Sequence, residues 1–119
     1  MLAKFFRATK HCGFHSHGID HTDHRAHRDP RLNYIDFLRY SDRAWRLLCV
    51  NRQDYTNRLR HSDYIRMLHE ADYEILQQRK YLHRDILREV EQMPLWGRYR
   101  DMSVDELATT WSHLVIRPA

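Results

Sequence analysis

The chain contains little glycine, proline or cysteine. Its 119 residues include three glycines, three prolines and two cysteines. Because Gly13, Gly18 and Gly97 are isolated from one another, the sequence holds no phosphate-binding loop of the GxGxxG or GxxxxGK(S/T) type. The shortage of glycine therefore argues against a self-sufficient nucleotide-binding domain.

The two cysteines and the apolar runs also limit the class of protein. Cys12 and Cys49 do not have the spacing of a metal or redox motif. Without a secretory signal, they predict free thiols in a reducing cytoplasm. No apolar run approaches the roughly 20 residues that cross a bilayer, so we expect a cytoplasmic protein without a membrane partner.

The chain is rich in both apolar and charged residues. It is 42% hydrophobic and 30% charged, which is sufficient for a modest core. The chain has twenty Lys and Arg residues and sixteen Asp and Glu residues, and the two signs are interspersed, as at Arg84-Asp85 and Arg88-Glu89. Such mixing is typical of a solvated surface, so a nucleic-acid partner is not the first expectation. A small basic nucleic-acid-binding module remains an alternative.

Apolar spacing and capping residues predict alternating helices and strands. The predicted elements are a helix at 2–9, a strand at 14–20, a loop at 21–33, a helix at 42–50 capped by Ser41, a helix at 63–70 capped by Ser62, a strand from Tyr73 to Lys80, a helix at 84–93 stopped by Pro94, a helix at 104–108 capped by Ser103, and a well-buried strand at 109–117. This order predicts an α/β layered fold.

Histidines are concentrated near the first predicted strand. Six of the ten lie between His11 and His27. On a strand, His15 and His17 share a face, and Asp20 and Asp23 could add oxygen ligands for a metal. Since no CxxC or HExxH motif accompanies them, the ligand set stays undetermined. A His-rich metal-binding protein is a second alternative.

Several strings, taken in order, resemble class I S-adenosylmethionine-dependent methyltransferases. Residues 2–13 resemble the helix and turn, commonly ending R-V-L-K-P-G-G, that precede the fifth sheet strand of that family. Residues 67–75 are similar to its helix-to-strand turn, usually A-G-F-E, with Asp72 where glycine is usual. Residues 109–115 resemble its closing strand, with Trp111 where a small residue is expected. Residues 37–41, 57–60 and 62–64 resemble segments of some bacterial members.

The resemblance implies the C-terminal part of a doubly wound Rossmann-like methyltransferase sheet. The last three strands of that family have the order five–seven–six, with the last strand antiparallel in the middle. We therefore expect 109–117 to lie between 14–20 and 73–80 in one partial domain, 1–119. Its parts would be helix-strand at 1–20, a loop and helical insertion at 21–61, and helix-strand-helices-strand at 62–119. A left-handed turn at Asp72 would cost more than at glycine.

The resemblance also implies a cofactor that this chain does not hold alone. The first four strands, the glycine-rich loop and the acidic residue that binds the cofactor ribose are absent from the sequence. S-adenosylmethionine is thus implied for the full-length family, whereas this chain is expected to be methyltransferase-like and inactive alone. The open edge of strand 14–20 predicts pairing with a complementing N-terminal half or with a second copy.

Candidate site residues follow from the same resemblance. Ligands of such sheets bind beyond the carboxyl ends of the strands, and the loop from Asp20 to His27 occupies that position. We expect His17, Asp20 and His24 near a small-molecule acceptor, with His24 as general base and Asp20 orienting it or binding a substrate hydroxyl. The candidates for shaping the acceptor pocket are Tyr40, Asn57 and Arg58.

Overall fold

The computed structural model describes residues 13–49 and 56–119. In chain order the elements are β1 (His15–Asp20), η1 (His24–His27), η2 (Asp36–Arg39), α2 (Asp42–Leu48), α3 (His61–Glu70), β2 (Tyr73–Leu82), α4 (Arg84–Val90), η4 (Gly97–Asp101), α5 (Val104–Ala108) and β3 (Thr109–Pro118). The helix predicted at 2–9 lies outside the described residues.

The three strands form one sheet in the order β1-β3-β2. β3 is antiparallel to both neighbours, with His15 opposite Ile116 in β1 and Tyr73 opposite Pro118 in β2. Since both neighbours run against β3, β1 and β2 run parallel to each other. The predicted α/β class and the antiparallel last strand in the middle are therefore confirmed.

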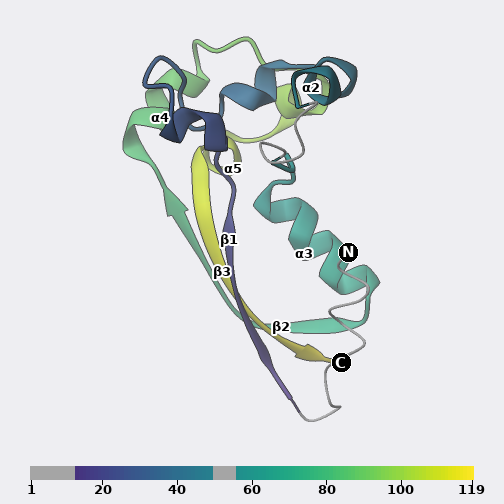
Figure 1. The fold of residues 1–119 in the computed structure, drawn as a ribbon. Helices are drawn as coiled ribbons and strands as arrows, with labels where there is room; N and C mark the ends of the chain where they lie inside the picture. The colour runs from purple at the N-terminus through teal and green to yellow at the C-terminus, as the bar shows by residue number, and fades with distance from the viewer. Residues whose placement is uncertain (1–12, 50–55) are drawn as a thin grey trace.

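Helix α3 covers one face of this sheet. Leu68 of α3 packs with Tyr73, Leu114 and Ile116 in a core between the helix and the strands (Figure 1). On β3 the buried residues alternate with partly exposed ones, and Trp111 is 37% exposed. The predicted burial of the closing strand therefore holds for the face that carries Leu114 and Ile116, and among the described residues the other face is only partly covered.

A second core lies at one end of the sheet. The elements η1, η2, α2, α4, η4 and α5, which we call the helical cap, gather beyond the carboxyl ends of β1 and β2 (Figure 1). Its buried centre includes Phe37, Trp45, Ile86, Tyr99 and Leu107. Burying a large apolar side chain contributes about 1.5–3 kcal/mol, so this cluster holds the elements of the cap together.

Local sequence signals explain most element boundaries. The Ser41 and Ser103 side chains accept hydrogen bonds from the Ala44 and Glu106 backbone N–H groups, at 3.1 Å each, as the N-cap predictions required. The N-cap predicted at Ser62 was wrong. Helix α3 begins at His61, and the Asp63 carboxylate accepts a hydrogen bond from the Arg60 N–H at 2.8 Å.

Three further boundaries differ modestly from expectation. The segment predicted as a loop contains the short 3-10 helix η1, whose Asp23 cap accepts from the Arg25 N–H. Strand β2 continues past Lys80 to Leu82. Helix α4 ends at Val90 rather than 93.

Asp72 occupies the left-handed turn between α3 and β2. Its φ is +57°, and its carbonyl accepts a hydrogen bond from the Ala119 N–H at 2.8 Å. Non-glycine residues pay a steric cost in this region, and Asp pays less than most. Asp72 thus adopts the left-handed conformation despite the cost expected for a residue other than glycine.

None of the helices in the described part of the chain is both long and apolar enough to cross a lipid bilayer.

Candidate functional site

The first candidate site is an Asp–His pair where β1 enters the helical cap. Asp20 Oδ1 accepts from the Thr22 N–H at 2.8 Å and from the Thr22 hydroxyl at 2.6 Å. Asp20 Oδ2 lies 3.2 Å from His24 Nε2. The structure therefore brings Asp20 and His24 together, with the carboxylate orienting the imidazole.

The electrostatics of the pair favour an ionised carboxylate. Partial burial alone would raise the pKa of Asp20, but the hydrogen bonds from Thr22 and the neighbouring His24 outweigh it and lower the pKa. The His24 side chain is 52% exposed, so its ring is accessible to a ligand. A half-exposed imidazole oriented by an ionised carboxylate is able to accept a proton from a bound group.

His17 does not join this pair. It precedes Asp20 by three residues on β1, which is about 10 Å along a strand, and alternation places the two side chains on opposite faces. Its ring stacks on His15 with centroids 5.6 Å apart. Burial, followed by the nearby His15 and His113, lowers the pKa of His17.

A row of rings continues from His24 across the cap. Ring centroids are 5.9 Å apart for His24 and His27, 5.6 Å for His27 and Tyr34, and 5.4 Å for Tyr34 and His83. His83 follows the end of β2, so the row joins the carboxyl ends of both outer strands. Within residues 13–49 and 56–119 no three His, Cys, Asp or Glu side chains converge to hold a metal ion.

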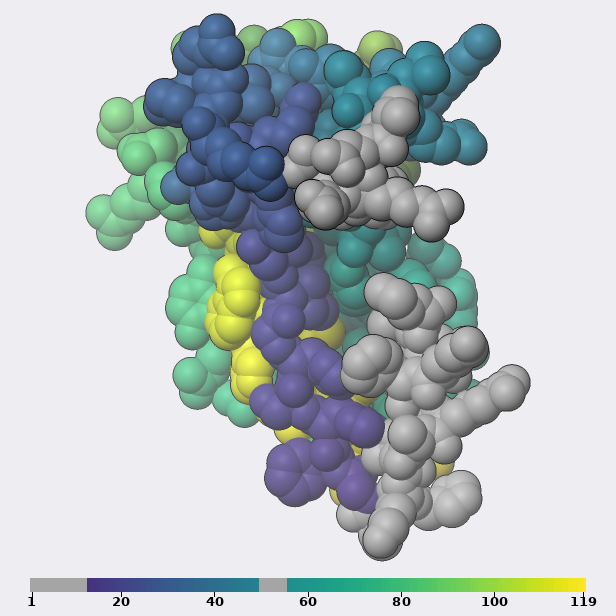
Figure 2. All heavy atoms as spheres, viewed as in Figure 1, coloured from purple at the N-terminus to yellow at the C-terminus, as the bar shows by residue number. Residues whose placement is uncertain are grey.

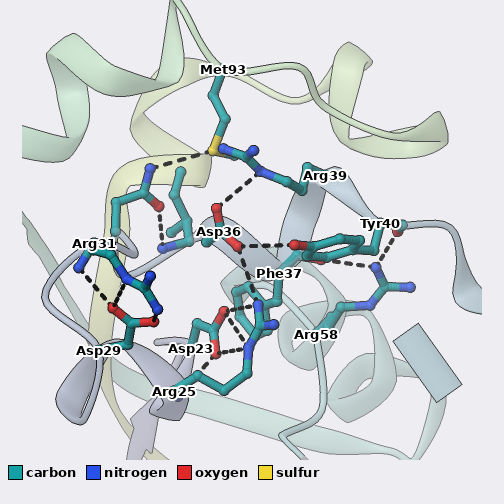
Figure 3. A network of polar contacts seen from close by, with 12 residues as sticks. Asp23, Arg25, Asp29, Arg31, Asp36, Phe37, Arg39, Tyr40, Arg58 and Met93 are labelled. Atoms are coloured by element: carbon teal, nitrogen blue, oxygen red, sulfur yellow. Dashed lines mark hydrogen bonds and ion pairs between the residues drawn. The ribbon is translucent and has the colours of Figure 1, made fainter. Parts of the chain in front are cut away.

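The second candidate site is built from arginines around Trp45. The Arg25 guanidinium lies 4.9 Å from the Trp45 ring centroid and the Arg58 guanidinium 5.7 Å from it. Arg25 also binds Asp23 and Asp36, as Figure 3 shows. The hydrogen bond to Asp23 is the main reason that the pKa of Arg25 is raised.

Two of the residues predicted to shape an acceptor pocket, Tyr40 and Arg58, are held in this network. Arg58 donates to the Phe37 carbonyl at 3.0 Å, to the Tyr40 carbonyl and to the Asp42 carboxylate. The Tyr40 ring stacks on Trp45 with centroids 6.3 Å apart. Both residues thus organise the cap, and Figure 3 shows Arg58 beside Tyr40.

Arg58 and Asn57 also line a pocket of about 540 Å³. It lies between α2, residues 57–59 and η4, and Asp42, Trp45, Arg46 and Arg98 form other parts of its wall. Asn57 is exposed and its amide contacts the Tyr64 hydroxyl at 3.3 Å. The predicted pair Asn57 and Arg58 therefore share a cavity, whereas Tyr40 is not among its described lining residues.

Sequence reasoning missed a buried polar cluster under the cap. Arg60 is fully buried and donates to the carbonyls of His21, Leu107 and Thr109 at 2.8, 2.9 and 2.7 Å. Burial is the main reason that the pKa of Arg60 is lowered to about 10. These bonds join the residue that follows β1, helix α5 and the first residue of β3, so Arg60 connects the sheet to the cap.

His21 belongs to the same buried cluster. Its Nδ1–H donates to the Leu59 carbonyl at 3.3 Å, and its Nε2 accepts from the Ser112 hydroxyl at 2.8 Å. This is the neutral ring, and burial together with the nearby Arg60 charge lowers the pKa of His21 to about 4. The polar segment around these residues has no periodic pattern that would have signalled their burial.

Comparisons of the chain with known protein families, with curated proteins and with solved structures found no match.

Proposed function

We propose that the chain is the C-terminal part of a class I S-adenosylmethionine-dependent methyltransferase fold and forms its acceptor side. The observation that supports this most is the strand arrangement, with β3 antiparallel between the parallel strands β1 and β2. This arrangement is the one that the resemblance implies for the end of the family's sheet. The left-handed turn at Asp72, between α3 and β2, supports it further.

The sequence contains no glycine-rich loop of the kind that holds this cofactor. Gly97 begins η4 with open space beside it, and a Cβ on Gly18 would meet the Trp111 ring at 2.8 Å. The glycines are isolated from one another, and no GxGxxG string is present. We therefore assign cofactor binding to residues outside this sequence, and methyl transfer requires them.

The chain's own residues supply the chemistry of the acceptor. His24 is placed to take the proton of an acceptor hydroxyl or amine, and Asp20 holds its ring in position at 3.2 Å. The position of this pair beyond the carboxyl end of β1 is the usual location of ligand sites in such sheets. His17, on the opposite face of β1, is left out of this role.

The outer edge of β1 is the proposed junction with the rest of the fold. Among the described residues, β1 pairs with β3 alone, and Figure 2 shows its atoms at the surface below the cap. β1 holds no lysine, whereas the other outer strand, β2, has Arg79 and Lys80, which discourage edge-to-edge pairing. We propose that a complementing half or a second copy pairs with β1.

Two measurements test the proposed function. Calorimetry of the 119-residue chain with S-adenosylmethionine is expected to show no binding, and the reading frame upstream of Met1, or a neighbouring gene, to encode strands with a glycine-rich loop. Micromolar binding of the cofactor by the chain alone would contradict the proposal. An immediate upstream stop codon, with no protein that copurifies with the chain, would also contradict it.

A further inference from the structure

The pocket beside Trp45 concentrates positive charge. Arg46, Arg58 and Arg98 contribute to its wall, and Asp42 is the one carboxylate among its described lining residues. Its volume of about 540 Å³ lies within the range of small-molecule sites, about 300–1,000 Å³. Because α2, residues 57–59 and η4 each supply part of the wall, the cavity belongs to the fold and not to one loop.

The charges around the cavity do not cancel. Arg58 is paired with Asp42, and Arg98 Nη1 is paired with Asp63 Oδ1 at 2.8 Å. Arg46 Nε donates to a backbone carbonyl, that of Asp42, at 3.3 Å. Among the described residues, therefore, Arg46 has no carboxylate partner, and its charge is available to a ligand.

Two of the three arginines are held in position before any ligand arrives. Arg58 is only 5% exposed in its side chain and is fixed by two backbone carbonyls and by Trp45 and Tyr99. Arg98 is held against the Tyr99 ring, 4.8 Å from its centroid. Pre-organised guanidinium groups lose little conformational entropy when they bind planar or tetrahedral oxyanions.

We infer that this pocket binds the oxyanion group of a small molecule, a phosphate or a carboxylate. Arg46 and Arg98 contact the oxyanion, the Asn57 amide adds a neutral donor, and Arg58 supplies a fixed positive charge at the base. The inference goes beyond the proposed function, because oxyanion binding requires no methyl transfer. If methyl transfer is the activity, the oxyanion belongs to the acceptor molecule.

The test titrates inorganic phosphate, and separately acetate, into the ¹⁵N-labelled chain against chloride at the same ionic strength. Binding is expected to move the side-chain signals of Asn57, Arg46 and Arg98. Arg46→Gln is expected to weaken binding about tenfold, the loss of one charge-assisted hydrogen bond. The matched control is Arg43→Gln, which removes an exposed arginine of the same helix that does not line the pocket.

The outcomes separate this inference from the proposed function. Phosphate or acetate shifts confined to the pocket and lost in Arg46→Gln support the inference, and the stronger of the two anions identifies the oxyanion. Absence of shifts with both anions overturns it, and so does an equal loss in Arg43→Gln, which would indicate general charge attraction. The calorimetry with S-adenosylmethionine does not depend on binding in this pocket. Oxyanion binding and the proposed methyltransferase fold can therefore fail independently of each other.

Discussion

Replacing Arg60 with methionine tests whether one buried guanidinium joins the sheet to the cap. The substitution leaves three backbone carbonyls, those of His21, Leu107 and Thr109, without the donor that they have at 2.7–2.9 Å. Each buried acceptor left unpaired costs about 1–3 kcal/mol, so the three together cost about 3–9 kcal/mol. Against this loss, methionine avoids the cost of burying a charged group, which is several kcal/mol.

The net expectation is a loss of about 3 kcal/mol in the free energy of unfolding. A domain of this size has about 6–18 kcal/mol in total, at about 0.05–0.15 kcal/mol per residue, so the variant loses a substantial share. Urea unfolding followed by tryptophan fluorescence measures the change as a lower midpoint. Arg60→Lys keeps the charge but loses the fork of donors, and we expect an intermediate midpoint.

Arg66→Met is the matched control for this substitution. Arg66 lies on the neighbouring helix α3, its side chain is 60% exposed, and it pairs with Glu70 at 3.1 Å. Removing an exposed pair of this kind changes stability by less than about 1 kcal/mol. Equal midpoints for Arg60→Met and Arg66→Met would refute the reasoning that Arg60 joins the two parts of the fold.

Four other outcomes are expected. Stability falls by about 3 kcal/mol as pH decreases from 6.5 to 4, because the unfolded chain protonates His21 at its ordinary pKa near 6.5 whereas burial lowers the folded-state pKa to about 4. In His21→Gln, the urea midpoint should fall less steeply between pH 6.5 and 4 than in the unmodified chain. An equally steep fall would contradict the assignment of this pH dependence to His21. Asp72→Gly should raise the thermal midpoint by a few degrees, about 1 kcal/mol, since φ is +57°, while the neighbouring Ala71→Gly, at φ −97°, should lower it. Gly18→Ala should cost about 1 kcal/mol and alter the near-ultraviolet circular dichroism of Trp111, because the added methyl would lie 2.8 Å from that ring, and an unaltered spectrum would count against the contact. Light scattering should detect self-association of the chain that Phe14→Lys reduces and Leu47→Lys, a similarly exposed apolar position on α2, does not.

The sheet was predictable from sequence because its signals are local. Apolar strings at 73–76 and 113–116 mark β2 and β3, and serine caps mark the starts of α2 and α5. The order of the strands came from the resemblance, since periodicity does not specify which strand lies in the middle. The expectation of a well-buried β3 holds for one face of the strand, because an apolar run does not reveal whether helices cover one face or two.

The candidate sites were predictable only in part. Asp20 and His24 are four residues apart across a strand end, and their 3.2 Å contact brings them together. Whether Asp20 orients His24 or binds a substrate hydroxyl stays a prediction. The role of Arg60 was not predictable, because its acceptors lie 39, 47 and 49 residues away in the chain. Likewise, the cavity beside Trp45 depends on η4, which no motif links to Asn57 and Arg58.

Labelling of the native polypeptide tests the central proposal most directly. An antibody raised against the 119-residue chain would recover the protein from its source cells, and tritiated S-adenosylmethionine would be crosslinked to it by ultraviolet light. We expect the label on a polypeptide, or on a tightly bound partner, that adds a glycine-rich half to residues 1–119. Recovery of the 119-residue chain alone, without a partner and without label, would contradict a methyltransferase fold completed at β1.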